Sequence, residues 1–484
     1  MKFDYDIGVI GGGAAGLTLA AGAARLGAKV LLVDKSKRLG GDCLHYGCVP
    51  SKTLLHVAKV YHQSRTMERL GLPTFHGSVD FAKIGEHIQS VIRKIEPHDS
   101  PERFMRLGVT VSQCLPEFQD EHTVCLDGRN VTARFWTLTT GSEPAIPDIP
   151  GLSDVPFLTN KTIFSLQQLP EHLVVLGAGP VALEMSQAFS RLGSRVSVIQ
   201  RNDQILSRED ADLAHLVQEQ LEVEGVRFHL ETAVQEIRKT EAQLTLKLVS
   251  GGRENALSAT HVLVATGRKA NVKGLGLERI AVRASDHGVQ VDDRLRCNGR
   301  NIFAAGDVTG RYQFTHAAAY EAGIVLANTV FRIPRKADYT AMPWCTYTDP
   351  ELASIGLNEK RAQAAGKNYV VWEEDLTSND RAITTGEATG KVKLLLDRRE
   401  RPLGVQICGP QAGEMLGIWA YAFSGKIGLS RLAGAIFPYP TLSEANKRVA
   451  GNFVGSKLFS DKVRFALKAL FGLQGSAKMD GARF

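Results

Sequence analysis

The stretch DIGVIGGGAAGLTLAAGAARLGAKVLLVDKS, residues 6–36, decides the fold of this chain. It reads as a short apolar strand, a glycine-rich turn, a helix-length segment and a second apolar strand. The same order returns at residues 173–203, in LVVLGAGPVALEMSQAFSRLGSRVSVIQRND. The two segments also share a local match, since ARLGAKV at 24–30 corresponds to SRLGSRV at 190–196. The chain therefore contains an internal repeat of strand, turn, helix and strand, which predicts an α/β fold.

Each repeat has a glycine turn of the G-x-G-x-x-G type between its first strand and its helix. The first glycine makes the tight turn, the second lets the backbone approach a pyrophosphate, and the third position packs the helix on the strand. The helix N-terminus attracts the phosphate charge. One such motif alone is a weak signal, but both copies lie between a strand and a helix. The residues expected to contact dinucleotides here are Gly11, Gly13, Ala15 and Gly16 in the first copy, and Gly177, Gly179, Pro180 and Val181 in the second, where Ala182 takes the third position.

The end of the second strand distinguishes the two nucleotides. In the first unit Asp34 stands 23 residues after Gly11, where a carboxylate binds a ribose 2′-hydroxyl, and Lys35 follows it. In the second unit Gln200 and Arg201 occupy the corresponding place. A guanidinium without a carboxylate favours a 2′-phosphate, so we expect NADPH rather than NADH in the second site. The alternative is that Arg201 is an ordinary solvated surface residue.

Two cysteines lie close together in the stretch GGDCLHYGCVPSK, residues 40–52. Cys43 and Cys48 could form a structural disulfide, bind a metal or act as a redox pair. A metal site would usually need a second ligand pair, and a static disulfide is rare in a reducing compartment. We therefore interpret the pair as redox-active and expect no resident metal. Residues five apart lie roughly 140° apart on a regular helix, so Gly47 and Pro50 favour an irregular or newly starting helix here.

Composition favours a cytoplasmic enzyme of several domains. The 484 residues exceed one ordinary core, and 44% hydrophobic with 23% charged residues are typical of a soluble globular protein. A net charge of +7 suits anionic cofactors and gives little support to nucleic acid as a partner. The seven cysteines do not suggest a secreted disulfide framework. The sequence shows neither a signal-peptide pattern nor a transmembrane-length apolar run.

Three further strand-to-turn segments complete the pattern: TLTTGSEP at 137–144, LVATGRKA at 263–270 and NIFAAGDVTG at 301–310. Together with the two nucleotide units and the cysteine pair, they make the chain resemble the class I FAD-dependent pyridine nucleotide–disulfide oxidoreductases. This is the family of dihydrolipoamide dehydrogenase, glutathione reductase and mercuric reductase. GGDCLHYGCVPSK is the most specific part of the match. The stretch IEPHDSPERFMRLGV at 95–109 is similar to the mercuric-reductase-like branch.

The resemblance implies an α/β fold with two Rossmann-like dinucleotide-binding domains, for FAD and NAD(P), plus a C-terminal α+β dimerisation domain. It implies a homodimer with one FAD per subunit and NADP or NAD as the second cofactor. The expected domains are an FAD-binding domain at 1–150 that returns at 271–338, an NAD(P)-binding domain at 151–270, an interface domain at 339–455 and an amphipathic tail at 456–484.

The resemblance also implies a route for electrons. Cys48 would be the thiolate against the flavin, and Cys43 the more exposed thiol that attacks substrate. Lys52 would lie near flavin N5, paired with Glu184 on the first helix of the second unit, where a cation favours the reduced flavin. Further FAD contacts are expected from Gly41, Asp42, Thr140, Gly141, Asp307 and the backbone of Thr315, and an NAD(P) contact from Gly267.

One stretch departs from the dihydrolipoamide dehydrogenase pattern. In FPYPTLSEANKR, residues 437–448, Tyr439 stands where those enzymes have the histidine of a His-Pro-Thr-x-x-Glu motif, while Glu444 matches. A phenol with an ordinary pKa of about 10 is a poor base at neutral pH. Mercuric reductases have a tyrosine near this position, but the tail GSAKMDGARF lacks their C-terminal cysteine pair. Tyr439 and Glu444 of the partner subunit would orient substrate or relay protons. The alternative for Tyr439 is a packed interface aromatic.

These patterns predict a homodimeric NAD(P)H-dependent flavoenzyme whose Cys43–Cys48 disulfide passes electrons to a thiol or disulfide substrate. Reduction of a soft metal ion is one alternative, and a catalytically weak flavoprotein subunit of a partner complex is another. After Gly451 the segment SKLFSDKVRFALKALFGL, residues 456–473, is basic and apolar at partly helical spacing. We expect it to pack on the dimer in preference to binding a membrane surface.

Overall fold

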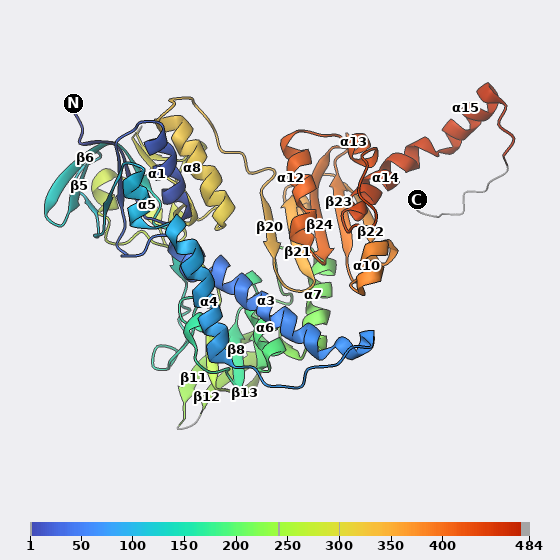
Figure 1. Cartoon of the computed structure of the whole chain (residues 1–484), viewed down its shortest axis with the longest axis horizontal. Helices are drawn as coiled ribbons and strands as arrows, with labels where there is room; N and C mark the ends of the chain where they lie inside the picture. Colours follow the sequence, from blue (N-terminus) through green and yellow to red (C-terminus); the bar gives the residue numbers. More distant parts are fainter. Residues whose placement is uncertain (1, 241–242, 300, 476–484) are drawn as a thin grey trace. The chain divides into compact units, whose positions relative to one another are not determined.

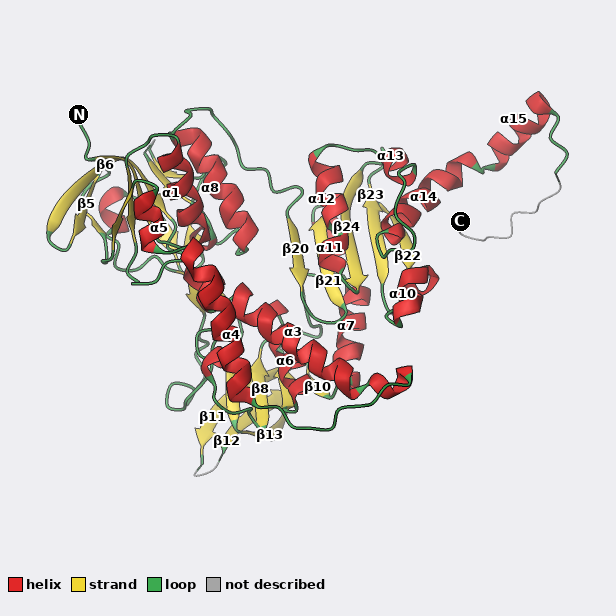
Figure 2. Cartoon of the chain, viewed as in Figure 1, coloured by secondary structure: helices red, strands yellow, loops and turns green. Residues whose placement is uncertain are grey.

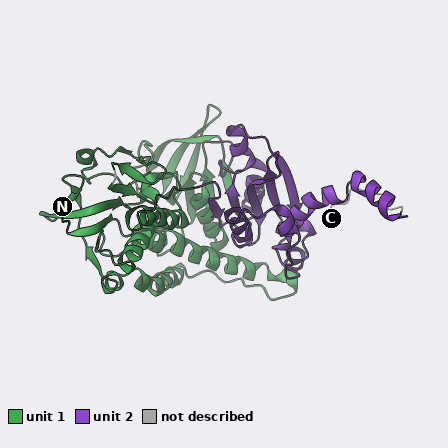
Figure 3. Cartoon of the chain, turned by 90° about the horizontal axis from the view of Figure 1, so that it is seen from above, with its two compact units in different colours: residues 1–201, 225–338 green, residues 202–224, 339–484 purple. Residues whose placement is uncertain are grey.

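The structure is a computed structural model that describes residues 2–240, 243–299 and 301–475. The chain divides into two compact units, coloured separately in Figure 3. Unit 1 comprises the chain up to Arg201 together with Gly225–Asp338, and unit 2 comprises Asn202–Glu224 together with the chain from Tyr339 onward. Helices and strands occur throughout both units (Figure 2), and the expected α/β class is confirmed. Among the described residues, no helix combines the length and the apolar character that crossing a membrane requires.

The largest sheet of unit 1 is built around the first glycine repeat. Its strand order is β18-β19-β6-β1-β2-β3, with β5 paired to β6 and β4 to β5. β1 pairs in parallel with both neighbours, so that Ile7 lies opposite Val30 and Phe135. All four residues of β2 are buried, as expected for a parallel strand covered on both faces. The strands are β1 (Tyr5–Ile10), β2 (Val30–Val33), β3 (Val109–Ser112), β4 (Glu117–Phe118), β5 (Thr123–Leu126), β6 (Arg129–Leu138), β18 (Arg296–Asn298) and β19 (Ile302–Ala304).

Two helices of unit 1 that are distant in sequence lie side by side (Figure 1). These are α1 (Ala14–Arg25) and α8 (Thr315–Thr329), and they share a core built largely from alanine, leucine and valine. Their N-terminal turns meet at Gly306, where a Cβ would lie 3.3 Å from the Cβ atoms of both Ala15 and Ala318. The start of α8 therefore lies close to the glycine turn that precedes α1.

The second glycine repeat builds a separate parallel sheet in unit 1. Its order is β10-β9-β8-β14, and an antiparallel sheet β11-β12-β13 accompanies it. The helix of this repeat, α6 (Pro180–Leu192), packs against α3 (Cys48–Arg65), which also contacts α4 (Phe81–Ile95). The contact between α3 and α6 joins the redox stretch to the second nucleotide unit. The strands are β8 (His172–Leu176), β9 (Arg195–Ile199), β10 (Val226–His229), β11 (Thr232–Lys239), β12 (Leu244–Ser250), β13 (Arg253–Ala259) and β14 (His261–Val264).

Unit 2 contains an antiparallel sheet with helices packed on it. The sheet order is β20-β21-β24-β23-β22. Its core includes the fully buried Trp419, whose indole N–H donates to Oδ1 of Asn446 at 2.8 Å. The elements are β20 (Pro343–Thr346), β21 (Glu351–Gly356), α9 (Glu359–Ala364), β22 (Val370–Asp375), α10 (Asp380–Thr385), β23 (Lys391–Leu396), β24 (Pro402–Gly409), α11 (Ala412–Met415), α12 (Gly417–Ser424), α13 (Leu429–Ala433), α14 (Glu444–Leu458) and α15 (Asp461–Phe471).

Residues 202–224, which lie inside the expected NAD(P)-binding span, pack with unit 2. This segment contains α7 (Ala211–Val223). The buried Glu209 accepts hydrogen bonds from the indole of Trp344 at 2.6 Å and from Ser354 at 2.8 Å. The buried Lys393 forms an ion pair with Asp210 at 3.2 Å. Because leaving any of these polar groups unpaired would be costly, the network ties the segment to the five-stranded sheet.

Candidate active site

The first glycine turn has the shape that a dinucleotide pyrophosphate requires. Gly11 has φ +113°, and a Cβ there would lie 2.2 Å from the carbonyl oxygen of Thr139. A Cβ at Gly16 would lie 1.9 Å from the carbonyl oxygen of Gly11, so the helix and the turn meet closely. No side chain caps the start of α1 at Gly13. The backbone N–H groups of the first helical turn therefore suit a phosphate ligand, and the residues fit FAD.

Asp34 is fixed beside this turn. It follows β2, and its two carboxylate oxygens accept hydrogen bonds from the backbone N–H groups of Gly12, at 2.5 Å, and Ser36, at 2.7 Å. Asp34 is half-buried while Lys35 is exposed. A carboxylate held at this place can accept from a ribose hydroxyl, as the sequence predicts.

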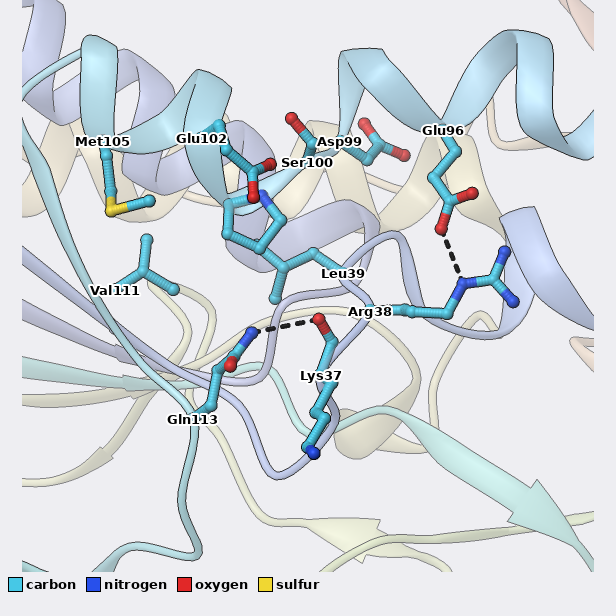
Figure 4. A pocket seen from close by; sticks show the side chains of 11 residues that line it. Lys37, Arg38, Leu39, Glu96, Asp99, Ser100, Glu102, Met105, Val111 and Gln113 are labelled. Carbon is cyan, nitrogen blue, oxygen red and sulfur yellow. Dashed lines mark hydrogen bonds and ion pairs between the residues drawn. The ribbon is translucent and has the colours of Figure 1, made fainter.

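The loop after Asp34 borders a cavity of about 620 Å³ (Figure 4). On its wall Arg38 forms an ion pair with Glu96 at 2.6 Å, and the side-chain amide of Gln113 donates to the carbonyl oxygen of Lys37 at 3.0 Å. Neither cysteine of the redox stretch lines the cavity. These two contacts tie the loop to Glu96 and Gln113. The lining residues are Lys37, Arg38, Leu39, Glu96, Asp99, Ser100, Pro101, Glu102, Met105, Val111 and Gln113.

The second glycine turn has the same construction. Gly177 has φ +98°, and a Cβ there would lie 2.7 Å from the carbonyl oxygen of Ala265. Gly179, by contrast, faces open space, and Pro180 begins α6 at a position where its missing N–H costs nothing. Ala182 is fully buried at the third position, whereas Val181 is exposed. The turn fits a second dinucleotide.

The end of β9 has no carboxylate. The backbone N–H of Gln200 donates to the carbonyl oxygen of His229 at 2.9 Å, which continues the parallel pairing by one residue. Arg201 follows and is exposed, and Gly267 faces open space near the end of β14. The guanidinium of Arg201 is therefore accessible to an anionic ligand at the place where a ribose carboxylate usually stands.

The redox stretch forms two helices with a break between the cysteines. Cys43 lies in α2 (Gly41–His45), and Cys48 is the first residue of α3. Gly47 has φ −123° and ψ −113°, and a Cβ there would lie 3.2 Å from the Cα of Cys43. The break therefore folds the chain back and brings the two sulfurs within hydrogen-bonding reach of each other. Gly47 and Pro50 predict this irregularity from the sequence.

The two cysteines have opposite electrostatic environments. A hydrogen bond from the thiol of Cys43, followed by the hydroxyl of Thr315 and the charge of Lys52, lowers the pKa of Cys48 to about 6. The same hydrogen bond, together with burial, raises the pKa of Cys43. The Sγ of Cys48 lies 3.5 Å from Oγ1 of Thr315. The pair thus favours a thiolate at Cys48 and a protonated thiol at Cys43.

The exposure of the pair differs from the expectation. Cys48 is exposed in the polypeptide and Cys43 is half-buried. The difference is local, because Cys43 lies inside the short helix α2, where Gly47 approaches its Cα, whereas Cys48 is the first residue of α3. The expectation that Cys43 is the more exposed thiol is therefore wrong for the polypeptide alone.

Lys52 and Glu184 form an ion pair one turn further along α3. The Nζ of Lys52 lies 2.7 Å from Oε2 of Glu184. The carboxylate belongs to α6 and its side chain is only 4% exposed, whereas that of Lys52 is 37% exposed. The buried carboxylate fixes the direction of the lysine, and this contact links the two nucleotide units.

A polar cluster that sequence reasoning missed lies between two predicted FAD contacts. Arg268 donates to Asp42 at 2.6 Å and to the hydroxyl of Ser142 at 2.7 Å, and Ser142 donates to Asp307 at 2.6 Å. Burial raises the pKa of Asp307. Arg268 and Ser142 each directly follow a glycine that the sequence did identify, Gly267 and Gly141. The sequence signal that could have identified Arg268 and Ser142 is their position directly after a strand-to-turn glycine.

Other predicted residues, Thr140, Gly141 and Gly41, make contacts with backbone groups. Thr140 donates from its hydroxyl to the carbonyl oxygen of Asn271 at 2.7 Å, and the N–H of Asn271 donates to the carbonyl oxygen of Gly141 at 3.0 Å. Gly41 approaches Gly13, since a Cβ on Gly41 would lie 2.9 Å from the Cα of Gly13. The redox stretch therefore borders the first glycine turn directly.

Tyr439 and Glu444 belong to unit 2, whereas Cys43 and Cys48 belong to unit 1. The hydroxyl of Tyr439 donates to Oδ2 of Asp380 at 2.8 Å, and this hydrogen bond raises the pKa of Tyr439. Glu444 accepts from the backbone N–H of Thr441 at 3.3 Å. Tyr439 is 70% exposed, so it is not a packed aromatic within its own chain. Asp380, like Arg268 and Ser142, is a residue that sequence reasoning missed, and no sequence signal connects it to Tyr439.

Comparisons with known proteins agree with this geometry. A model of the family described as pyridine nucleotide-disulphide oxidoreductase matches residues 5–322, and a model of that family's dimerisation domain matches residues 342–450. A mercuric reductase from Staphylococcus aureus is 31% identical over 452 residues, which cover 93% of this chain and 82% of that protein. A dihydrolipoyl dehydrogenase from Bacillus subtilis (strain 168) is 33% identical over 446 residues, covering 90% and 96%.

A solved structure is also similar. It is the Cu(II) complex of the HOCl-induced flavoprotein disulfide reductase RclA from Escherichia coli. The TM-score is 0.81 at 26% identity, with 90% of this chain and 98% of that chain covered. The similarity therefore extends over almost the full length of that reductase.

Proposed function

Because the chain belongs to the pyridine nucleotide-disulphide oxidoreductase family, we propose that it takes electrons from NADPH and reduces a disulfide substrate at Cys43. As a member, it is an NAD(P)H-dependent flavin disulfide oxidoreductase with FAD as its cofactor, and its dimerisation domain makes it a homodimer. The preference for NADPH, the direction of the reaction, the substrate and a cytoplasmic location are the proposed parts.

The unequal environments of the cysteines support the proposal most strongly. Cys48 is stabilised as a thiolate by donors from Cys43 and Thr315 and by the charge of Lys52, while Cys43 keeps its proton. A structural disulfide does not require opposite pKa shifts at its two cysteines. A pair that opens and closes needs one sulfur to hold negative charge, and the other sulfur to give up its proton as it attacks the substrate.

The exchange steps balance within the pair. Bound FAD supplies the two-electron transfer from NADPH that opens the Cys43–Cys48 disulfide. Cys43 then attacks one sulfur of the substrate disulfide, forms a mixed disulfide and releases one thiol, which leaves with the proton of Cys43. The Cys48 thiolate attacks the sulfur of Cys43, releases the second substrate thiolate and restores the Cys43–Cys48 disulfide.

The remaining residues have positioning roles in this proposal. Lys52, held by Glu184, places a positive charge near Cys48 and would act on the flavin from there. Arg268 fixes Asp42 and Asp307, which would hold FAD, and Arg201 would bind the 2′-phosphate of NADPH. The proposed domain boundaries are those expected from the sequence, with residues 202–224 anchored on the interface domain.

Steady-state turnover of the holoenzyme tests the proposal. NADPH and NADH are each supplied with lipoamide, glutathione disulfide or a small aromatic disulfide as acceptor. We expect NADPH oxidation that requires a disulfide and is lost in both Cys43→Ser and Cys48→Ser. If the wild type reduces no disulfide, or if Cys43→Ser retains full turnover, the proposed substrate class is wrong.

Reduction of a soft metal ion is the second candidate, because the Tyr439–Asp380 hydrogen bond counts against a dithiol substrate. Position 439 offers a phenol with a raised pKa, whereas a dithiol substrate would use an imidazole for proton transfer there. The similarity to a mercuric reductase and to a reductase solved with Cu(II) supports the same substrate class. NADPH oxidation that depends on Hg(II) or Cu(II) and continues without any disulfide would favour this candidate. A rate of NADPH oxidation that does not change when metal is added would exclude the metal-reductase candidate.

A further inference from the structure

Helix α15, near the C-terminal end of the described chain, lies outside the part of the protein that the family accounts for. The dimerisation-domain model ends at residue 450, within α14, and α15 spans Asp461–Phe471. The match to the family's dimerisation domain therefore does not include this helix. The sequence alone favours packing of this segment on the dimer, and the exposed side chains of α15 are the reason to argue for a different occupant.

The chain itself leaves α15 uncovered. None of its residues is buried. Large apolar side chains are exposed to an extent that is unusual for a helix of a globular protein, including Leu470 at 75% and Phe471 at 71%. Leu473, just past the helix, is also exposed.

The apolar and basic side chains of α15 lie on different arcs. At about 100° per residue, Val463, Ala466, Leu467 and Leu470 fall within roughly 100° of one another, and Phe471 extends this arc. The three basic residues flank the arc: Lys462 on one side, and Arg464 and Lys468 on the other. Phe465 lies on the opposite arc, next to Asp461. We name the set Val463, Ala466, Leu467, Leu470 and Phe471 the apolar face of α15.

We propose that α15 binds an anionic membrane surface, with its apolar face in the headgroup and acyl boundary and its basic residues at the lipid phosphates. The helix has three basic residues and one acidic residue, which complements the charge of anionic lipid. Leucine and phenylalanine on the face, with lysine and arginine at its borders, are typical of helices that lie in the interface plane. No described helix is suited to span the bilayer, so the contact is peripheral.

Lipid sedimentation with the full-length holoenzyme tests this. The probes are sucrose-loaded vesicles of phosphatidylcholine alone and of phosphatidylcholine with phosphatidylglycerol at a molar ratio of about seven to three. We expect roughly tenfold stronger binding to the anionic vesicles, weakened by added salt because the charges are exposed. Equal or absent sedimentation with both vesicle types would overturn the proposal.

Two matched substitutions separate the face from the charge. Leu470 and Phe465 are 75% and 77% exposed on the same helix, so Leu470→Glu and Phe465→Glu make the same change of charge at equal exposure. We expect Leu470→Glu to weaken vesicle binding about tenfold and Phe465→Glu by no more than about threefold, because Leu470 lies in the apolar face and Phe465 opposite it. Equal loss in both variants would overturn the proposed orientation.

The main competing occupant is a second copy of the chain. Light scattering of wild type and Leu470→Glu reports it directly. If Leu470→Glu changes the oligomeric mass of the protein and the wild type does not bind anionic vesicles, α15 docks on a partner subunit and the membrane proposal is wrong. NADPH turnover with a disulfide serves as the folding control, and we expect it to be unchanged, since α15 contributes no residue to the proposed reaction.

Discussion

The hydroxyl of Tyr439 donates a hydrogen bond to Oδ2 of Asp380 at 2.8 Å, and this contact raises the pKa of the phenol. Tyr439 stands where the dihydrolipoamide dehydrogenase pattern has an imidazole. Asp380 begins α10, whose N-cap residue Asn379 also donates to the carbonyl oxygen of Thr441 at 3.1 Å. The loop that contains Tyr439 is therefore fixed to the start of α10 by two hydrogen bonds. Because the phenol proton is already engaged, Tyr439 is neither a ready acid nor a ready base near neutral pH.

Replacing Tyr439 with histidine should create a dithiol oxidase. We expect Tyr439→His to raise the rate of dihydrolipoamide oxidation roughly 100-fold, since a positioned imidazole contributes about 10²–10⁴-fold by general base catalysis. Steady-state rates with NADP or NAD as acceptor measure it. Tyr439→Phe is the control, and it should bring no gain. A wild type that already oxidises dihydrolipoamide rapidly, with no improvement in Tyr439→His, would contradict this account of Tyr439.

The acidity of Cys48 predicts how the reduced holoenzyme responds to pH. Because the pKa of Cys48 is lowered to about 6, its thiolate persists at pH 7 and is lost as the pH falls through about 6. The long-wavelength absorbance between thiolate and flavin should follow this titration under anaerobic conditions. Thr315→Val removes a donor to the thiolate, so the midpoint should rise by about one unit, the size expected for one hydrogen bond to a charged group.

Thr315→Ser keeps the hydroxyl and is the matched control for that titration. Its midpoint should stay within a few tenths of a unit of the wild type. A common midpoint for all three proteins would show that the contact between Thr315 and Cys48 does not tune the thiolate.

Much of the site follows from local sequence, because its turns and its helix break are determined by residues that are close together in the chain. The turns at Gly11 and Gly177, and the break at Gly47, need backbone shapes or close approaches that glycine permits and other residues resist. Chain geometry and residue type are sufficient to predict such features. The separation of Cys43 and Cys48 into two helices is of this kind.

The contacts that sequence could not supply join residues far apart in the chain. Arg268 meets Asp42 across 226 positions, and Tyr439 meets Asp380 across 59. Each depends on how separate elements pack, and a solvated arginine or aspartate has the same local sequence. The packing of residues 202–224 with unit 2 is similar, since it rests on buried polar partners such as Glu209 and Trp344 rather than on periodicity.

The Lys52–Glu184 ion pair can be broken from either side, and the two substitutions should shift the midpoint potential of the flavin in opposite directions. Lys52→Met removes a positive charge near the proposed N5 position and should lower the two-electron midpoint potential. Glu184→Gln removes the compensating carboxylate and should raise it. Shifts of roughly 30 mV correspond to about 1.4 kcal/mol for a two-electron couple. Anaerobic equilibration with reference dyes measures both, and shifts of the same sign would refute the proposed arrangement.

Arg201 should decide between the two nicotinamide cofactors. If its guanidinium binds the 2′-phosphate, Arg201→Ala removes a charge-assisted contact and should lower kcat/KM for NADPH about 10- to 100-fold. The same variant should change kcat/KM for NADH by no more than about twofold, because NADH has no 2′-phosphate. Gln200→Glu is the complementary change, because its carboxylate can accept a hydrogen bond from the ribose 2′-hydroxyl and repels the 2′-phosphate. This variant should therefore have a higher kcat/KM for NADH and a lower kcat/KM for NADPH. Equal losses with both cofactors in Arg201→Ala would show that Arg201 supports the fold of the loop rather than the choice of nucleotide.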